Sequence, residues 1–303
     1  MRYQITGDDG TLIASLEGVC RTLTEALNNE KQNVPGHVPH PPFQCVFSES
    51  DEPQAKAMPM DGVSVICITK GMLGLVWTTC DLLSKSEHVI QLFNHAPTNQ
   101  IHTALFQTQL SFILCHEYAH HVHGHLTQSS FGLEAGDIQT QVLEVDADCY
   151  AIYFVLAFLT NGTGRAGAVE RLNCADANGD AQDEALIASF VLATGGFLYA
   201  TPPVPLDTVR VFQQRYPPLA ARMNWITHSA MDWCDQNKPH LKEWMTLDKW
   251  KVLMSFAATA VAELNGAAHW GDQISFLTSE KGAEYVRMVM ARFGEYKDSL
   301  YQR

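Results

Sequence analysis

Several features that mark large classes of protein are scarce or missing from this sequence. Its 303 residues hold only 20 Lys and Arg against 33 Asp and Glu, a net charge of −13. No basic cluster is present that would attract nucleic acid or an anionic membrane. The eight cysteines are scattered without a CxxC motif, and the opening MRYQITGDDG is polar, unlike a signal peptide. We therefore expect reduced thiols, a cytoplasmic location and no nucleic-acid partner.

Long uninterrupted apolar runs are also missing. Residues 149–160 are apolar for only twelve positions. Residues 185–206 are uncharged, but Gly195 and Gly196 are expected to leave a helix of about ten residues there. Both runs are shorter than the roughly twenty residues that cross a bilayer. We expect buried core helices and no integral membrane span, and the 46% hydrophobic composition suffices for a full core.

An HExxH motif, formed by His116, Glu117 and His120, is the main chemical signal. On an α-helix, residues four apart lie on one face, so both imidazoles can converge on a single zinc ion. Glu117 would then face the metal-bound water. Zinc lowers the pKa of that water, and the carboxylate accepts its proton as the water attacks an amide. The spacing predicts a zinc peptidase site.

The third ligand separates the classes of HExxH peptidase. Leu126 stands ten residues after His116, where metzincins have a histidine, and no HxxEH motif occurs. Glu144 lies 28 residues after His116 on a second predicted helix, with Asp148 one turn further on the same face. An aspartate there can accept the other ring N–H of a zinc-bound histidine. The alternative is a solvated acidic edge, but the helix then becomes apolar, where unpaired charge is costly.

Three further histidines follow the motif. His123 lies about 20° around the helix from His116 and is a rival metal ligand. His121 and His125 point away from that face, so packing or surface positions are expected for them.

Periodicity and helix-breaking residues predict a mostly α-helical chain with a small sheet. Strands are expected at residues 44–50 and 63–69, joined by a loop over 51–62. We expect the second strand to form the sheet edge and to hold substrate as an added strand, with a central strand as the alternative. A proline-rich connector occupies residues 34–43 and a loop 161–167. Helices are expected at 11–32, 71–85, 100–125 and 137–160, and beyond 205 with breaks at Pro217-Pro218, Pro239 and near Gly266.

Four ordered blocks within about residues 54–223 resemble the HtpX/CAAX-prenyl-protease-like family of gluzincin peptidases. The first is QAKAMPMDGVSVICITKGML, with Gln54 where asparagine is usual. The family's HExxHxxxxH, ExxxD and HPxxxxRI patterns are matched in turn by His116, Glu117, His120 and His125, by Glu144 and Asp148, and by YPPLAARM with Tyr216, Pro217, Arg222 and Met223. Tyr216 stands where the family often has histidine.

Two other departures from the HtpX/CAAX-prenyl-protease-like pattern are similar to features of a different branch of gluzincins. The gap between the two metal motifs is short, and the hydrophobic spans of membrane members are missing. Both features are similar to the soluble phage-exclusion peptidases of the Lit type, which are cytoplasmic and act on a translation factor. Either branch implies an α+β, mostly α, zincin-like fold with a small sheet and a pair of active-site helices. We expect an N-terminal helix and connector (1–50), a catalytic core (51–205) and a C-terminal helical region packed on it (206–303).

Motifs and resemblance together predict a zinc metalloendopeptidase that cuts intracellular proteins or peptides. One Zn²⁺ per chain would be bound by His116, His120 and Glu144, with Glu117 as base and then proton donor, and Asp148 orienting a ligand. Tyr216 or Arg222 is expected to stabilise the oxyanion, with a helix-capping turn as the equal alternative. The rival functions are a non-catalytic zinc-stabilised sensing or binding module and a helical structural protein with a coincidental motif. Glu117 argues against the first, because a structural zinc needs no base.

Overall fold

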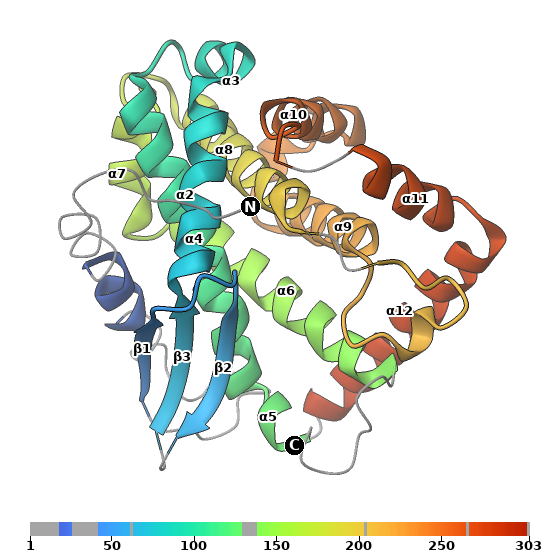
Figure 1. Cartoon of the computed structure of the whole chain (residues 1–303). Helices are drawn as coiled ribbons and strands as arrows, with labels where there is room; N and C mark the ends of the chain where they lie inside the picture. The colour runs from blue at the N-terminus through green and yellow to red at the C-terminus, as the bar shows by residue number, and fades with distance from the viewer. Residues whose placement is uncertain are drawn as a thin grey trace.

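The computed structural model describes residues 18–25, 42–60, 63–128, 138–202, 205–264 and 267–301. Over these residues the chain is mostly helical with one three-stranded sheet, which confirms the expected α+β, mostly α class (Figure 1). Of the helix expected at 11–32, residues 18–25 are helical and the remainder lies outside the described residues. Most of the proline-rich connector, residues 34–41, also lies outside them.

The sheet contains β1 (Phe43–Ser48), β2 (Ala55–Met60) and β3 (Val63–Thr69), in the order β1-β3-β2. β3 pairs in parallel with β1 and antiparallel with β2. The strands predicted at 44–50 and 63–69 are confirmed, but two other expectations are wrong. The loop predicted over 51–62 contains β2, and β3 is the central strand rather than the edge. Its run of β-branched residues fits that buried position.

β2 instead forms an edge of the sheet within the described part of the chain, and it contacts helix α4 (Thr98–Val122). Its sequence AKAMPM contains no β-branched or aromatic residue, so its strand conformation depends on pairing with β3 rather than on local propensity. The sheet lies at one end of the helical body, with α4 behind it (Figure 1).

A tight junction joins the sheet to α2 (Lys70–Lys85). The Thr69 hydroxyl accepts the N–H of Met72 at 3.1 Å, which caps the helix, and also accepts the N–H of Gln54 at 2.9 Å. A Cβ at Gly71 would lie 2.2 Å from the carbonyl oxygen of Asp51. Only glycine therefore allows the first turn of α2 to pack against the segment that leads into β2.

The remaining helices make up the rest of the helical body (Figure 1). Helices predicted at 71–85 and 137–160 are confirmed, and the one predicted at 100–125 is confirmed as far as Val122, where α4 ends. The breaks at Pro217-Pro218 and Pro239 are confirmed, and Gly266 lies outside the described residues. The loop predicted over 161–167 is wrong in its second half. The helices not yet named are α3 (Glu87–Leu92), α5 (His125–Gln128), α6 (Ile138–Thr160), α7 (Gly164–Arg171), α8 (Gly179–Ala200), α9 (Leu219–Asn237), α10 (Leu247–Ala260), α11 (Ala267–Leu277) and α12 (Glu280–Tyr301), with 3₁₀ turns η1 (Val211–Gln213) and η2 (Pro239–Leu241). α4 packs on α2, α6 and α8, and α9 and α12 pack on α6.

Helix α8 passes through Gly195 and Gly196 without a break, so the expected shortening of this helix is wrong. A Cβ at Gly195 would lie 2.5 Å from the sulfur of Met254, and one at Gly196 would lie 2.8 Å from Leu83 Cδ1. The glycines thus permit close approach of α10 and α2. Among the described helices, α8 alone is long and apolar enough to cross a membrane, yet 83% of that apolar window is buried within the protein. This burial is typical of a core helix.

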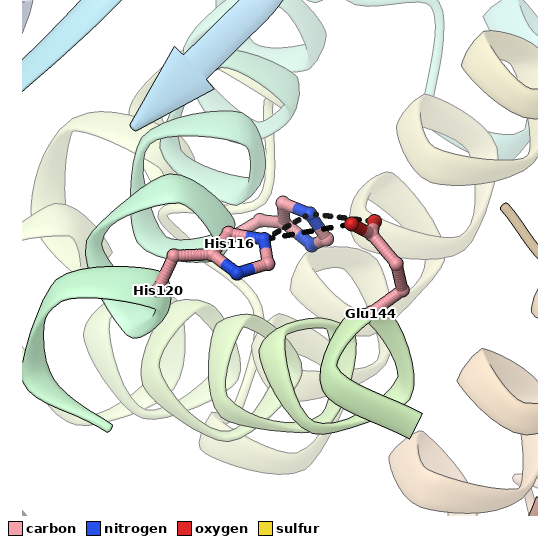
Figure 2. A group of neighbouring side chains, drawn as sticks. All are labelled: His116, His120 and Glu144. Atoms are coloured by element: carbon pink, nitrogen blue, oxygen red, sulfur yellow. Dashed lines mark hydrogen bonds and ion pairs between the residues drawn. The ribbon is translucent and has the colours of Figure 1, made fainter. Parts of the chain in front are cut away.

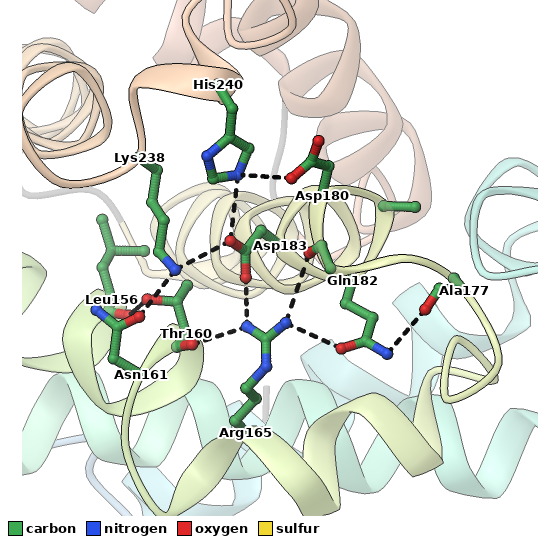
Figure 3. A network of polar contacts seen from close by, with 12 residues as sticks. Leu156, Thr160, Asn161, Arg165, Ala177, Asp180, Gln182, Asp183, Lys238 and His240 are labelled. Carbon is green, nitrogen blue, oxygen red and sulfur yellow. Dashed lines mark hydrogen bonds and ion pairs between the residues drawn. The ribbon is translucent and has the colours of Figure 1, made fainter.

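A polar network around the buried Asp183 side chain joins α6, α7, α8 and η2 (Figure 3). Asp183 on α8 is 4% exposed and pairs with Arg165 of α7, with Lys238 Nζ at 2.9 Å and with His240 Nε2 at 3.2 Å. Arg165 also donates to the carbonyl oxygen of Thr160, at the end of α6, at 2.7 Å. Burial opposes ionisation of Asp183, but Arg165 and Lys238 hold the pKa of its carboxyl below the ordinary value.

We predict that Asp183→Asn lowers the free energy of unfolding by about 2–3 kcal/mol, because two cations lose their buried partner. This is below the value for fully buried pairs, since the Arg165 side chain is 27% exposed. The carboxylate stabilises the fold above its ordinary pKa, and this contribution disappears as pH falls through the lowered pKa, so the two proteins should converge in acid. Urea unfolding at several pH values measures the free energy of unfolding of both proteins.

Asp180→Asn, at a side chain 71% exposed, is the control, and its free energy of unfolding should change little. Equal losses in Asp183→Asn and Asp180→Asn would contradict the role of Asp183.

Candidate active site

Helices α4 and α6 bring His116, His120 and Glu144 together (Figure 2). The two Nε2 atoms are 3.3 Å apart, and they lie 3.4 Å and 3.8 Å from the Glu144 carboxylate oxygens. Ligand atoms bonded at 2.0–2.1 Å to one tetrahedral zinc ion are about 3.3 Å apart. The spacing of two imidazole nitrogens and a carboxylate therefore fits a single ion of this kind.

The electrostatics of these three side chains also suit a cation. Burial disfavours the charged form of His116, but Asp148 and Glu144 raise its pKa to about 10. Burial likewise opposes ionisation of Glu144, yet the two histidines hold its pKa at about 2. The pKa of His120 is well below its usual value, chiefly because of burial. The carboxylates are thus ionised, and the site attracts positive charge.

Asp148 holds His116 from behind. Its Oδ1 lies 2.9 Å from His116 Nδ1, so the opposite ring nitrogen faces Glu144. Arg222 of α9 donates two hydrogen bonds to the same carboxylate, from Nε to Oδ2 at 2.9 Å and from Nη2 to Oδ1 at 2.6 Å. Burial opposes the charge on Asp148, but Arg222 and His116 keep its pKa well below the ordinary value. Arg222, expected as a candidate oxyanion donor, is therefore directed at Asp148.

Glu117 lies between α4 and the sheet edge. Its Oε2 accepts the backbone N–H of Ala57 on β2 at 2.7 Å. Burial and the charge of Glu144 raise the pKa of Glu117, although His116 acts in the opposite direction. A raised pKa suits a carboxylate that accepts a proton near neutral pH. One turn further along α4, His121 Nε2 lies 3.0 Å from the carbonyl oxygen of Val65, which fixes the helix against β3. This contact was not expected from the sequence.

Tyr216 lies in the segment between η1 and α9 and is 42% exposed. Burial is the main reason that its pKa is raised, and the charge of Glu144 adds to the effect, which indicates proximity to the site. The Gln141 side chain on α6 donates to the carbonyl oxygens of Val211 and Gln214 at 2.8 Å and 2.7 Å. Helix α6 therefore supports this segment one turn before it supplies Glu144.

A second group of side chains adjoins the first. His123 Nδ1 and His125 Nε2 both contact Oδ2 of Asp146, the latter at 3.0 Å, and His125 Nδ1 lies 2.8 Å from His120 Nδ1. The structure thus groups His123, the rival ligand, with Asp146 rather than with the first three residues. Packing or surface positions were expected for His125, which instead is buried and bonded to His120. Gly124, between His123 and His125, is the sequence signal that could have indicated that the helix ends there and that the His125 ring turns back toward His120.

Comparison with known proteins gives one match. No curated protein and no solved structure matches the chain. The family model described as Peptidase U49 matches residues 83–237, just over half of the chain. That range includes both helices that meet at the site and Tyr216 and Arg222, but not the sheet. The match supports the expected peptidase, in keeping with the Lit-type resemblance, and lends nothing to the HtpX/CAAX detail. The chain therefore belongs to the peptidase U49 family.

Proposed function

We propose that this peptidase is a zinc-dependent endopeptidase that hydrolyses peptide bonds of intracellular proteins. One Zn²⁺ per chain would be held by His116, His120 and Glu144. The observation that carries the proposal is the 3.3–3.8 Å spacing of their nitrogen and oxygen atoms at a buried, negatively charged place. Membership of a peptidase family supports the reaction type.

Zinc at this site would supply a Lewis acid that lowers the pKa of water and polarises the scissile carbonyl. Glu117 accepts a proton as water adds to the carbonyl carbon, and it returns that proton to the amine nitrogen as the C–N bond breaks. The Ala57 N–H holds one carboxylate oxygen of Glu117, so its position is fixed relative to β2. Asp148 and Arg222 keep His116 in one orientation.

Substrate would bind along β2 rather than along β3. β2 is the edge strand that contacts α4, and Ala57 on this strand already bonds to Glu117. An extended peptide that pairs with such an edge gains main-chain hydrogen bonds, which makes recognition depend on backbone shape. The scissile bond would then lie beside the base.

Tyr216 is the better candidate for the oxyanion donor. Arg222 commits its guanidinium to Asp148, whereas the Tyr216 ring is partly exposed and lies near the charges of Glu144 and Glu117. A phenol O–H can donate to an oxygen that gains negative charge in the transition state.

We predict one zinc per chain in protein purified without a histidine tag. His116→Ala, His120→Ala and Glu144→Ala should each lose the metal, because each removes a ligand, and Glu117→Gln should keep it as the control. Elemental analysis of the purified proteins measures the content. Full zinc in Glu144→Ala together with loss in His123→Ala would contradict the ligand assignment.

We predict that Glu117→Gln lowers peptide cleavage by about two to four orders of magnitude, because an amide cannot accept the proton. The free energy of unfolding and the zinc content should stay unchanged. New protein N-termini in cells that express wild type, compared with Glu117→Gln, report activity and substrate together. Zinc binding without any new N-termini would favour the zinc-stabilised binding module instead.

Substitutions of Tyr216 and Arg222 should differ in their effects on turnover and on zinc binding. Tyr216→Phe is expected to lower kcat by about 10²–10³ at unchanged zinc affinity, since only the oxyanion donor is removed. Arg222→Ala should chiefly weaken zinc binding, because Asp148 loses the partner that holds it against His116. Chelator competition and turnover are measured on the same samples. A Tyr216→Phe enzyme with wild-type kcat would exclude this role.

A further inference from the structure

We propose that His125, held by Asp146, is a positioning residue that fixes the ring orientation and tautomer of His120. The proposal rests on the proposed function in one respect, namely that His120 is a metal ligand. His125 itself contacts no reacting group in this arrangement. It acts on the site through His120 alone.

A turn at the end of α4 makes this contact possible. The helix ends at Val122, and the N–H groups of His123 and Gly124 bond to the carbonyl oxygens of Ala119 and His121 at 2.9 Å and 3.1 Å. Gly124 has φ of 72°, the left-handed conformation that ends many helices and that glycine adopts without strain. α5 then begins at His125. On a continued helix His125 would point away from His120, but the turn carries its ring back to it.

The hydrogen-bond chain assigns one tautomer to each ring. His120 must offer the lone pair of Nε2 to a metal, so its proton resides on Nδ1. His125 Nδ1, 2.8 Å away, then accepts that N–H and carries its own proton on Nε2. The Nε2–H donates to Oδ2 of Asp146 at 3.0 Å. An ionised carboxylate at the end of the chain thus determines which nitrogen of His120 is free.

His123, His125 and Asp146 also have the composition of a metal-binding group. In this structure both ring nitrogens lie at hydrogen-bonding distance from the same oxygen of Asp146, and the other nitrogen of the His125 ring contacts His120. The Asp146 side chain is 4% exposed, and two ring N–H groups supply the partners that its buried charge requires.

The two histidines of HExxH are thereby held in parallel ways. Asp148 contacts His116 directly, and Asp146 reaches His120 through one additional imidazole. Both aspartates come from α6, the helix that supplies Glu144. One helix therefore provides a ligand and the groups that orient the other two. Partners of this kind typically change metal affinity 10–100-fold when they are removed.

The test compares His125→Phe with His123→Phe. Phenylalanine keeps a ring and removes both nitrogens, so His125→Phe should bind zinc about 10–100-fold more weakly in a chelator competition. The absorption spectrum of its cobalt-loaded form should also differ from wild type, because the ligand His120 changes orientation. His123→Phe is the matched control. It loses the same carboxylate partner, but the ring nitrogen 2.8 Å from His120 Nδ1 belongs to His125, so the zinc affinity of His123→Phe should stay close to wild type.

A second pair of variants separates the chain from a purely structural role. Asparagine at 125 places its amide oxygen near the position of Nδ1 and can accept from His120, whereas glutamine places its amide near Nε2. His125→Asn should therefore bind zinc more tightly than His125→Gln, at equal stability of the metal-free proteins in urea.

Equal affinities in these two variants, or equal losses in His125→Phe and His123→Phe, would overturn the proposal. Wild-type protein that binds no zinc would refute the metal site and the positioning role together. Wild-type protein that binds zinc but cuts nothing would refute the peptidase mechanism alone and leave the affinity comparison intact.

Discussion

The contact between α4 and α6 is the constraint on which the rest of the site depends. Helix α6 carries Glu144, Asp146 and Asp148 into a buried position, where an unpaired carboxylate would cost several kcal/mol. The histidines of α4 and the turn after it, with Arg222, supply the partners. Each pairing requires one rotation and one translation of α6 against α4. Because both helices are buried along most of their length, these polar contacts determine the register that hydrophobic packing leaves open.

Helix α4 also bonds to two strands of the sheet. Glu117 bonds to the main chain of β2 and His121 to that of β3, while the histidines between and beyond them face α6. α4 is buried along nearly its whole length and has different polar partners on successive sides. The edge strand, the candidate base and the candidate metal ligands are therefore connected through α4.

Local patterns in the sequence predict the long helices, β1 and β3, and the grouping of His116, His120 and Glu144. Helix geometry places residues four apart on one face, so HExxH and ExxxD need only two helices that pack together. β2 could not be predicted, because AKAMPM becomes a strand by pairing with β3. The partner of Arg222 lies 74 residues away in the chain, which no local rule reaches. The role of His125 depends on a reversal at Gly124, and a helical projection continued past that glycine gives the wrong direction.

The bond from Ala57 to Glu117 uses a peptide N–H rather than a side chain. Every amino acid except proline supplies that donor, so nearly any substitution at position 57 preserves it. Sequence drift at this position can alter packing without removing the group that holds the carboxylate. A shift of β2 by one residue along β3 would exchange the faces to which its side chains point, but it would bring the N–H of Lys56 or Met58 to the same place. The placement of Glu117 is thus encoded in the main chain of the edge strand, a property of the fold that is largely insensitive to the identity of any single residue.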